Sequence, residues 1–371
     1  MFEQPSVWIA IIAFLAAIGP LVFFHELGHY GVARMFGVKA EAFSIGFGRE
    51  IFGWTDKRGT RWKVGWLPLG GFVKFAGDMD AASTPDPQSA DPDHFQNRPV
   101  YQRFLIVLAG PMANFILAIL IYATLFASLG MVQSSNIIGE VEPGSSAAQM
   151  DLRPGDEVLA IADRDIRNFE DIARTVALRP GETVELTVIR DERQIALSGQ
   201  LGVVVDEIGG GQTARRGQLG VRSVQPEFSR LPVGTALVEG YHATAGMTLS
   251  IIDGMGQIIT GKRSLRELGG PLKMAQISGQ FWLMGFYTFI GLVALLSINL
   301  GFINLLPIPM LDGGHLALYT VEAIKRKPLS EVAQERVFRG GLVFLIMFFL
   351  FVTLNDTITI GLVDRLQRLI G

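Results

Sequence analysis

The chain has 371 residues, of which 49% are hydrophobic and only 18% are charged, and its mean hydropathy is +0.35. Because typical soluble domains carry about 25% charged residues, this composition argues against an ordinary soluble protein and indicates a membrane protein. The net charge of −3 favours no charged partner, and we expect no nucleic-acid partner. The absence of cysteine excludes both a disulfide framework and a thiolate site.

Four apolar stretches predict four membrane-spanning helices. Each approaches or exceeds the roughly 18–20 residues that a helix needs to cross a bilayer. They are Val7–Phe24, Leu105–Gly130, Phe281–Met310 and Gly341–Val363, and only the last contains a charged residue, Asp356. No basic residue precedes the first stretch and no small-residue cleavage site follows it, so we expect a retained helix rather than a signal peptide. The predicted fold class is therefore a polytopic α-helical membrane protein.

The positions of Lys and Arg predict the orientation of these spans. The basic residues gather between spans one and two and again between spans three and four. The positive-inside rule places these two connections in the cytoplasm, and it places both termini and the long segment 131–280 outside. Arg365 and Arg368, near the C-terminus, weakly favour the opposite orientation.

The first span leads into the motif His25-Glu26-Leu27-Gly28-His29, and we expect its helix to continue to about Met35. Four residues are just over one helical turn, so both imidazoles project from the same face and can bind one tetrahedral Zn²⁺. Glu26 lies beside that site, where it can take a proton from a water molecule that the zinc acidifies. Such groups at membrane depth are costly and usually functional, which favours a zinc site over interfacial side chains that reach water.

Residues 41–77 predict a β-hairpin. Short aromatic and β-branched runs lie on either side of the turn signal Asp56-Lys57-Arg58-Gly59. The Phe and Trp content suits a membrane interface or the wall of a buried cavity, and a small soluble β-subdomain is the alternative. The acidic, proline-containing residues 78–99 that follow predict a mobile loop.

Residues 135–203, between the second and third spans, predict a compact α+β domain. We expect strands at 137–141, 157–161, 183–190 and 193–201, and an amphipathic helix at 168–177. This pattern, with the turn Leu152-Arg153-Pro154-Gly155-Asp156, resembles a PDZ domain of bacterial membrane proteases. The resemblance implies that a peptide adds as a strand beside the first of these strands, in contact with Ile137, Ile138, Gly139 and Val141. A glycine-rich hinge is expected at 209–211, and a helix lying along the membrane is expected at 233–260.

The third span ends in the run Asn304-Leu305-Leu306-Pro307-Ile308-Pro309-Met310-Leu311-Asp312-Gly313. Its two prolines break the helix, and the freed backbone groups are tolerated at membrane depth only inside protein or beside a polar cavity. Asp312 directly follows the break, where it can become the third protein ligand that a catalytic zinc uses. A simpler alternative to a metal ligand remains: residues 307–314 form only the turn that ends the helix, and Asp312 caps the next helix.

The two motifs together resemble the site-2 protease family, and in particular its bacterial RseP/RasP branch. The segment Ala109-Gly110-Pro111-Met112-Ala113-Asn114-Phe115 is similar to that branch's G-P-x-x-N stretch, and Gly270-Pro271 and 297–301 are similar to other family stretches. The resemblance implies one Zn²⁺ per chain, held by His25, His29 and Asp312, with Glu26 as the general base. It further implies that Asn304 and Pro309 contact the substrate, and that the hairpin is membrane-associated and lies near the active site.

From this resemblance we expect an intramembrane zinc endopeptidase. Its substrates would be single-span membrane proteins, for example an anti-sigma factor, which another protease has already trimmed before they are cut in regulated intramembrane proteolysis. The expected location is the bacterial inner membrane, with the active site toward the cytoplasm and the PDZ-like domain in the periplasm. The protein is expected to be a monomer in contact with membrane lipid.

The expected parts are an N-terminal membrane part at 1–130, the PDZ-like domain at 131–208, a linker and amphipathic segment at 209–280, and a C-terminal membrane part at 281–371. Well-studied relatives carry two tandem PDZ domains, whereas this sequence predicts one. Asn114 either packs between helices or lines the site, and packing is the simpler expectation. His315 is expected to be structural or to support the metal ligands.

Two other classes of function fit parts of the sequence. A non-catalytic scaffold would recruit partners through the PDZ-like domain, but it would have no need of a metal triad. A metal transporter would usually show paired repeats with sites between them, and the sequence shows no such duplication.

Overall fold

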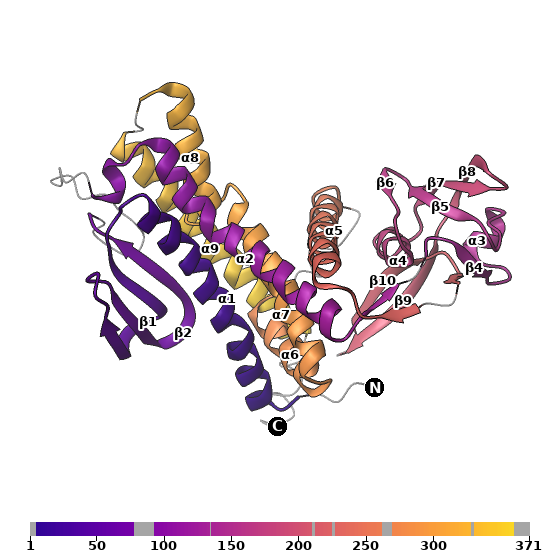
Figure 1. Ribbon diagram of the computed structural model, residues 1–371, viewed down its shortest axis with the longest axis horizontal. Helices are drawn as coiled ribbons and strands as arrows, with labels where there is room; N and C mark the ends of the chain where they lie inside the picture. The colour runs from indigo at the N-terminus through magenta and orange to yellow at the C-terminus, as the bar shows by residue number, and fades with distance from the viewer. Residues whose placement is uncertain are drawn as a thin grey trace. The chain divides into compact units, whose positions relative to one another are not determined.

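The structure is a computed structural model that describes residues 5–77, 93–133, 135–209, 212–224, 227–261, 269–327 and 330–359. Two compact units make up the chain (Figure 1). The first is built from Met1–Tyr122 and Gly269–Asp356, and the second from Ala123–Leu268 and Thr357–Gly371. Most of the predicted acidic loop at 78–99 lies outside the described residues, as do Gly210, Gly211, Arg365 and Arg368.

Four described helices are long and apolar enough to cross a membrane. They are α1 (Val7–Met35), α2 (Val100–Ser128), α7 (Phe286–Leu305) and the stretch Gln334–Thr357 of α9 (Glu331–Thr359). The four predicted spans are therefore confirmed, and the protein is an integral membrane protein. The third span starts at Phe286 rather than at Phe281, because Gly285 adopts φ +116° and separates α7 from the preceding helix α6 (Pro271–Leu283).

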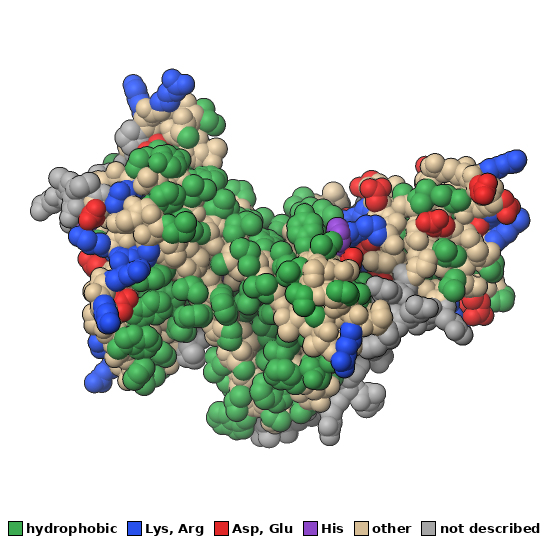
Figure 2. All heavy atoms as spheres, viewed as in Figure 1, with side chains coloured by type: hydrophobic (Ala, Val, Ile, Leu, Met, Phe, Trp, Pro, Cys, Tyr) green, Lys and Arg blue, Asp and Glu red, His purple; other side chains and the backbone are tan. Residues whose placement is uncertain are grey.

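Large apolar side chains remain exposed on these helices, as a lipid-facing surface requires. On α9, for example, Phe344, Phe348 and Phe351 are between 44% and 47% exposed. Hydrophobic side chains cover much of the helical unit on the face seen in Figure 2. The buried contacts between helices are made instead by residues such as Ala13 and Ala17 of α1, which pack against Leu292 of α7.

Asp356, the one charged residue of the fourth predicted span, has a structural partner. It is fully buried in α9, and its carboxylate accepts hydrogen bonds from the backbone N–H groups of Gly270 and Lys273, each at 2.9 Å. These are N–H groups that the first turn of α6 would otherwise leave unpaired. A side chain from another helix therefore caps α6, which explains the presence of a carboxylate in an apolar helix.

The predicted hairpin is present as β1 (Ala40–Thr55) and β2 (Arg61–Phe75), which pair antiparallel. Asp56 closes the turn, since its Oδ1 accepts hydrogen bonds from the N–H groups of Arg58 and Thr60 at 2.8 and 3.0 Å. Trp62 Nε1 donates to Oδ2 at 3.0 Å, and these bonds hold the pKa of Asp56 below its usual range. The short runs expected from the sequence join into two long strands with several shifts of register.

The second unit contains a four-stranded antiparallel sheet in the order β6-β5-β7-β8. Its strands are β5 (Glu157–Ile161), β6 (Arg164–Asp165), β7 (Thr183–Arg190) and β8 (Arg193–Gln200), and its helices are α3 (Ser146–Gln149) and α4 (Phe169–Ala177). The fully buried side chains of Val158, Ile161 and Leu186 lie at the centre of its core. The strands and the amphipathic helix expected between 137 and 201 are all present.

Strands also continue beyond the predicted boundary at residue 208. That boundary falls inside β9 (Gly202–Gly209), which pairs with β10 (Gln212–Gln218), so Gly209 belongs to a strand rather than to a hinge. Next, β11 (Val221–Ser223) pairs with β4 (Ile138–Val141), and β12 (Glu227–Ser229) pairs with β3 (Met131–Gln133). The expected helix at 233–260 is present as α5 (Val233–Ile259), and Asp253 ties it to the α+β domain through Arg179 at 3.2 Å.

Candidate metal centre

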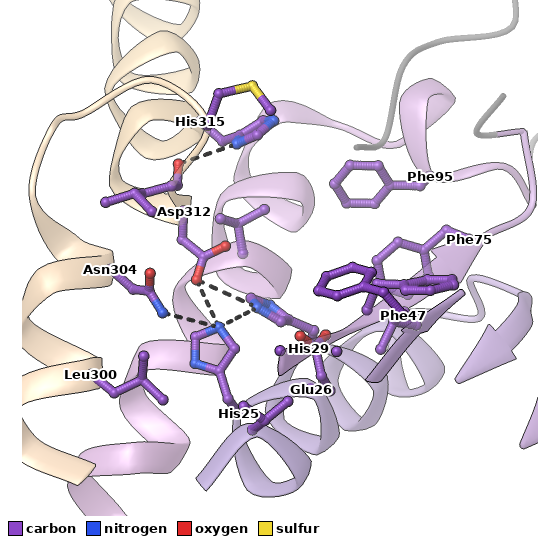
Figure 3. A pocket seen from close by; sticks show the side chains of 18 of the residues that line it. His25, Glu26, His29, Phe47, Phe75, Phe95, Leu300, Asn304, Asp312 and His315 are labelled. Atoms are coloured by element: carbon purple, nitrogen blue, oxygen red, sulfur yellow. Dashed lines mark hydrogen bonds and ion pairs between the residues drawn. The ribbon is translucent and has the colours of Figure 1, made fainter. Parts of the chain in front are cut away.

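Three side chains that are far apart in the sequence converge in the first unit (Figure 3). His25 and His29 lie one turn apart on α1, and Asp312 is the first residue of α8 (Asp312–Lys325). Asp312 Oδ2 is 3.0 Å from Nε2 of His25 and 3.5 Å from Nε2 of His29, and the two Nε2 atoms are 3.2 Å apart. The structure thus brings together the three residues that the sequence predicts as metal ligands.

The proline-containing break after α7 delivers Asp312 to this group. Leu306 is extended at the end of α7, and Met310 takes a left-handed φ of +76°, which is unusual for a residue with a side chain. A Cβ on Gly314 would lie 2.5 Å from the carbonyl oxygen of Ile308, so the turn can close only around glycine. Leu311 is the N-cap of α8 and Asp312 points at the imidazoles, so Asp312 does not cap this helix.

The hydrogen bond of His29 fixes which of its ring nitrogens carries the proton. Its Nδ1 lies 2.9 Å from the carbonyl oxygen of Ile106 in α2, and a carbonyl can only accept. The proton is therefore on Nδ1, and Nε2 presents its lone pair toward Asp312. Among the described residues the buried Oδ2 of Asp312 accepts no hydrogen bond. A lone pair and a carboxylate oxygen that face each other in a buried site can both bind one cation, so this donor set fits zinc.

Glycines let α2 approach α1 closely at this point. A Cβ on Gly110 would overlap the ring of His29, including Nε2, and a Cβ on Gly28 would overlap the carbonyl oxygen of Ala109. Pro111, which follows Gly110, has no N–H and leaves the Val107 carbonyl without its helical donor. The absence of a side chain at Gly110 therefore makes room for the imidazole of His29.

Gly110→Ala should displace the His29 imidazole from the metal group. Zinc affinity should fall by at least about tenfold, the smallest loss usually seen when a residue that orients a metal ligand is replaced. Alanine favours a helix over glycine by about 1 kcal/mol, so a loss cannot come from helix propensity. The matched control is Gly31→Ala on α1, where a Cβ meets nothing within 4 Å. Chelator competition on the purified variants measures both, and equal zinc affinities would contradict the steric argument.

The hairpin holds Glu26, the predicted base. The backbone N–H of Val73 in β2 donates a hydrogen bond to the Glu26 carboxylate. Gly71 lies directly against the same side chain, because a Cβ there would be 3.2 Å from Cγ of Glu26 and 2.7 Å from Cγ1 of Val22. The carboxylate is thus fixed between α1 and β2, beside the two imidazoles.

A cavity of about 480 Å³ opens onto the metal group. Its wall includes Gly70, Gly71 and Phe72 of β2 and the ring of Phe47 from β1. Asn304 lines it from α7, with Nδ2 3.5 Å from Nε2 of His25. Pro309 is not among the described residues of the wall and packs instead against Gly341 of α9.

His315 also lines this cavity, from α8. Its Nδ1 lies 3.4 Å from the carbonyl oxygen of Leu311, and its ring centroid is 4.8 Å from that of Phe338. Burial lowers the pKa of the His315 imidazole. It is not part of the group formed by His25, His29 and Asp312.

Comparison with known proteins shows the family. The sequence profile of peptidase family M50 matches residues 13–348. The chain belongs to this family. It is 39% identical over 359 residues to the "Putative zinc metalloprotease Atu1380" of Agrobacterium fabrum, covering 93% of this chain and 95% of the relative. It is also 37% identical over 389 residues to the "Metalloprotease MmpA" of Caulobacter vibrioides, covering 94% of this chain and 95% of the relative.

The predicted family and the predicted zinc dependence are thereby confirmed, and this M50 peptidase is a zinc-dependent metalloprotease. Among the described residues, His25, His29 and Asp312 form the cluster that can hold the metal. The roles of the individual residues, including Glu26 as base and Asn304 as substrate contact, remain predictions that the geometry supports.

The structure adds one contact that the sequence did not assign. Asn114 of α2 lies one turn beyond Gly110, and its Nδ2 is 3.1 Å from Nδ1 of His25. The sequence signal for this contact is a polar residue in an apolar span, close to Gly110-Pro111. Packing between helices accounts for such a residue equally well.

Proposed function

We propose that this M50 peptidase is an intramembrane endopeptidase that cuts single-span membrane proteins in or near their transmembrane segment. The observation that supports this most strongly is the location of the metal group. Two ligands lie on the apolar helix α1, and the third directly follows the end of the apolar helix α7. A peptide bond must therefore reach groups that belong to membrane-spanning helices.

The residues divide the reaction among them. His25, His29 and Asp312 would hold the zinc. When bound, zinc supplies the Lewis acidity that polarises the substrate carbonyl and acidifies a water. Glu26, oriented by the N–H of Val73, takes the proton of the attacking water and passes it to the leaving amine. Asn304, in the cavity wall, holds the substrate strand beside these groups.

A helical substrate must unwind locally before it can be cut. A peptide bond inside a helix has its carbonyl hydrogen-bonded and shielded by side chains, and only an extended segment exposes it. Transmembrane segments that contain Gly or Pro open at lower cost, by about 1 kcal/mol for each Gly. We expect such segments to be the preferred substrates.

The hairpin is proposed to be membrane-associated. Ile51, Phe52, Trp54 and Trp66 are between 51% and 69% exposed on it, a surface that suits the interface of a bilayer. The positions of Lys and Arg support a location in the bacterial inner membrane, with the metal centre toward the cytoplasm. We further propose that the protein works as a monomer, and that another protease has already trimmed its substrates.

The α+β domain is proposed to be a periplasmic PDZ-like domain that binds a newly exposed C-terminus or excludes untrimmed substrates. Strand addition was expected beside Ile137, Ile138, Gly139 and Val141. However, β4 pairs with β11 on one side, and Ile137 bridges to Glu157 on the other. Within the described residues β11 pairs with β4 alone, so we place the peptide at β11 (Val221–Ser223) instead.

Cleavage of reconstituted model substrates tests the proposal. The full-length protein in proteoliposomes is given two single-span proteins, one with a uniform Leu/Ala span and one with a central Gly pair. Mass spectrometry of the fragments should locate cleavage within or at the edge of the span, and the Gly-containing span should be cut faster by about fivefold or more. Cleavage confined to the soluble segments, or none by a zinc-loaded sample, would rule the proposal out, and the latter would favour the scaffold.

A further inference from the structure

We infer that Asn114 is a positioning residue for zinc: its side-chain amide oxygen accepts the proton of His25 Nδ1 and thereby leaves His25 Nε2 free to bind the metal. The inference rests on the proposed metal centre and adds a residue from the second span to it. Neither the motif His25-Glu26-Leu27-Gly28-His29 nor Asp312 accounts for this contact.

The geometry around Asn114 is unusual for a residue that only packs. The side chain is fully buried in α2, with Nδ2 3.1 Å from Nδ1 of His25. Its Oδ1 is buried as well and has no hydrogen-bond partner among the described residues. A buried polar atom left unpaired costs about 1–3 kcal/mol, a cost that packing alone gives no reason to keep.

Zinc binding through Nε2 requires the opposite orientation of this amide. A neutral imidazole carries one proton, and if Nε2 gives its lone pair to the metal, the proton must be on Nδ1. An Nδ1–H group that faces the amide nitrogen of Asn114 would place donor against donor. A half-turn of the amide brings Oδ1 onto Nδ1 and moves the nitrogen to the position of the unpaired oxygen.

The two histidines are therefore supported in different ways. His29 donates from Nδ1 to the main-chain carbonyl of Ile106, an acceptor that no substitution removes. His25 depends on a side chain, and the backbone of that side chain is itself anchored: Ser297 of α7 donates from Oγ to the carbonyl oxygen of Asn114 at 2.8 Å.

Zinc affinity of three variants tests the inference. Asn114→Leu keeps the volume and removes the acceptor, and we expect zinc binding to weaken by about 10–100-fold, the usual cost of losing the partner of a ligating histidine. Asn114→Asp keeps an acceptor in either orientation and should bind zinc about as tightly as the wild type. The control is Asn299→Leu, because Asn299 also lies in an apolar helix, where its amide bonds the carbonyl of Leu295 at 3.2 Å.

The dissociation constants come from chelator competition on the full-length protein in detergent, and visible spectra of the Co²⁺-loaded samples report ligand geometry. A shifted spectrum is expected for Asn114→Leu and not for Asn299→Leu. Wild-type zinc affinity in Asn114→Leu, or equal losses in the Leu and Asp variants, would overturn the inference, since packing alone would then explain the residue. A wild-type protein that binds no zinc would overturn the metal centre itself.

Discussion

Glu26→Gln should slow cleavage of a single-span substrate by about 10²–10⁴-fold or more, the usual contribution of a general base. Glutamine keeps the shape of the side chain and can still accept the hydrogen bond from the Val73 N–H, but it cannot take a proton from water. Glu26 is not one of the three converging ligand residues, so equimolar zinc should remain. Turnover is measured on the reconstituted substrate, and metal content by elemental analysis of the same sample.

Glu41→Gln is the matched control for this substitution. Glu41 lies at the start of the hairpin and pairs with Lys74 at 2.9 Å, with both side chains substantially exposed, so the pair contributes little. The control should cleave at the wild-type rate. Undiminished cleavage by Glu26→Gln would remove Glu26 from the mechanism, whereas loss of zinc in that variant would show that it binds the metal.

Asp312→Asn should weaken zinc binding by more than the roughly 10–100-fold that loss of a histidine's supporting partner costs. The substitution keeps the size of the side chain and removes the negative charge that faces the two imidazoles at 3.0 and 3.5 Å. Loss of zinc should abolish cleavage as well. Chelator competition at fixed pH measures the dissociation constant for the variant and the wild type.

A second effect of Asp312→Asn has to be separated from the loss of the ligand. Asp312 is in the first turn of α8, where a carboxylate stabilises the helix by about 0.3–1 kcal/mol. Asp171→Asn removes a carboxylate from the first turn of α4 in the other unit and controls for this effect. Unchanged zinc affinity in Asp312→Asn would remove this residue from the metal centre.

The helical part of the centre could be predicted from the sequence because local geometry determines it. Four-residue spacing puts His25 and His29 on one helix face wherever the helix lies, and α1 does run to Met35 as expected. Asp312 was a weaker prediction, because nothing local brings residue 312 to residue 25. It depended on the proline break and on the family resemblance together.

Contacts that depend on long-range pairing could not be predicted. The pairing of β11 with β4, and hence the extension of the α+β domain beyond 208, joins strands separated by a whole sheet in the sequence. The contact from Asn114 to His25 likewise depends on how closely α2 approaches α1. Gly28 and Gly110 allow this close approach, but their presence in the sequence does not predict it. The cap that Asp356 gives to α6 belongs to the same class.

Zinc K-edge X-ray absorption on the purified full-length protein is the most direct measurement of the metal centre. Two imidazole nitrogens at about 2.0–2.1 Å and oxygen ligands at about 2.0–2.2 Å are the predicted first neighbours of the metal. The multiple-scattering signal of the two imidazole rings should fall by half in His25→Ala and in His29→Ala. A spectrum with oxygen neighbours alone, or one that neither variant changes, would contradict a zinc site built from His25, His29 and Asp312.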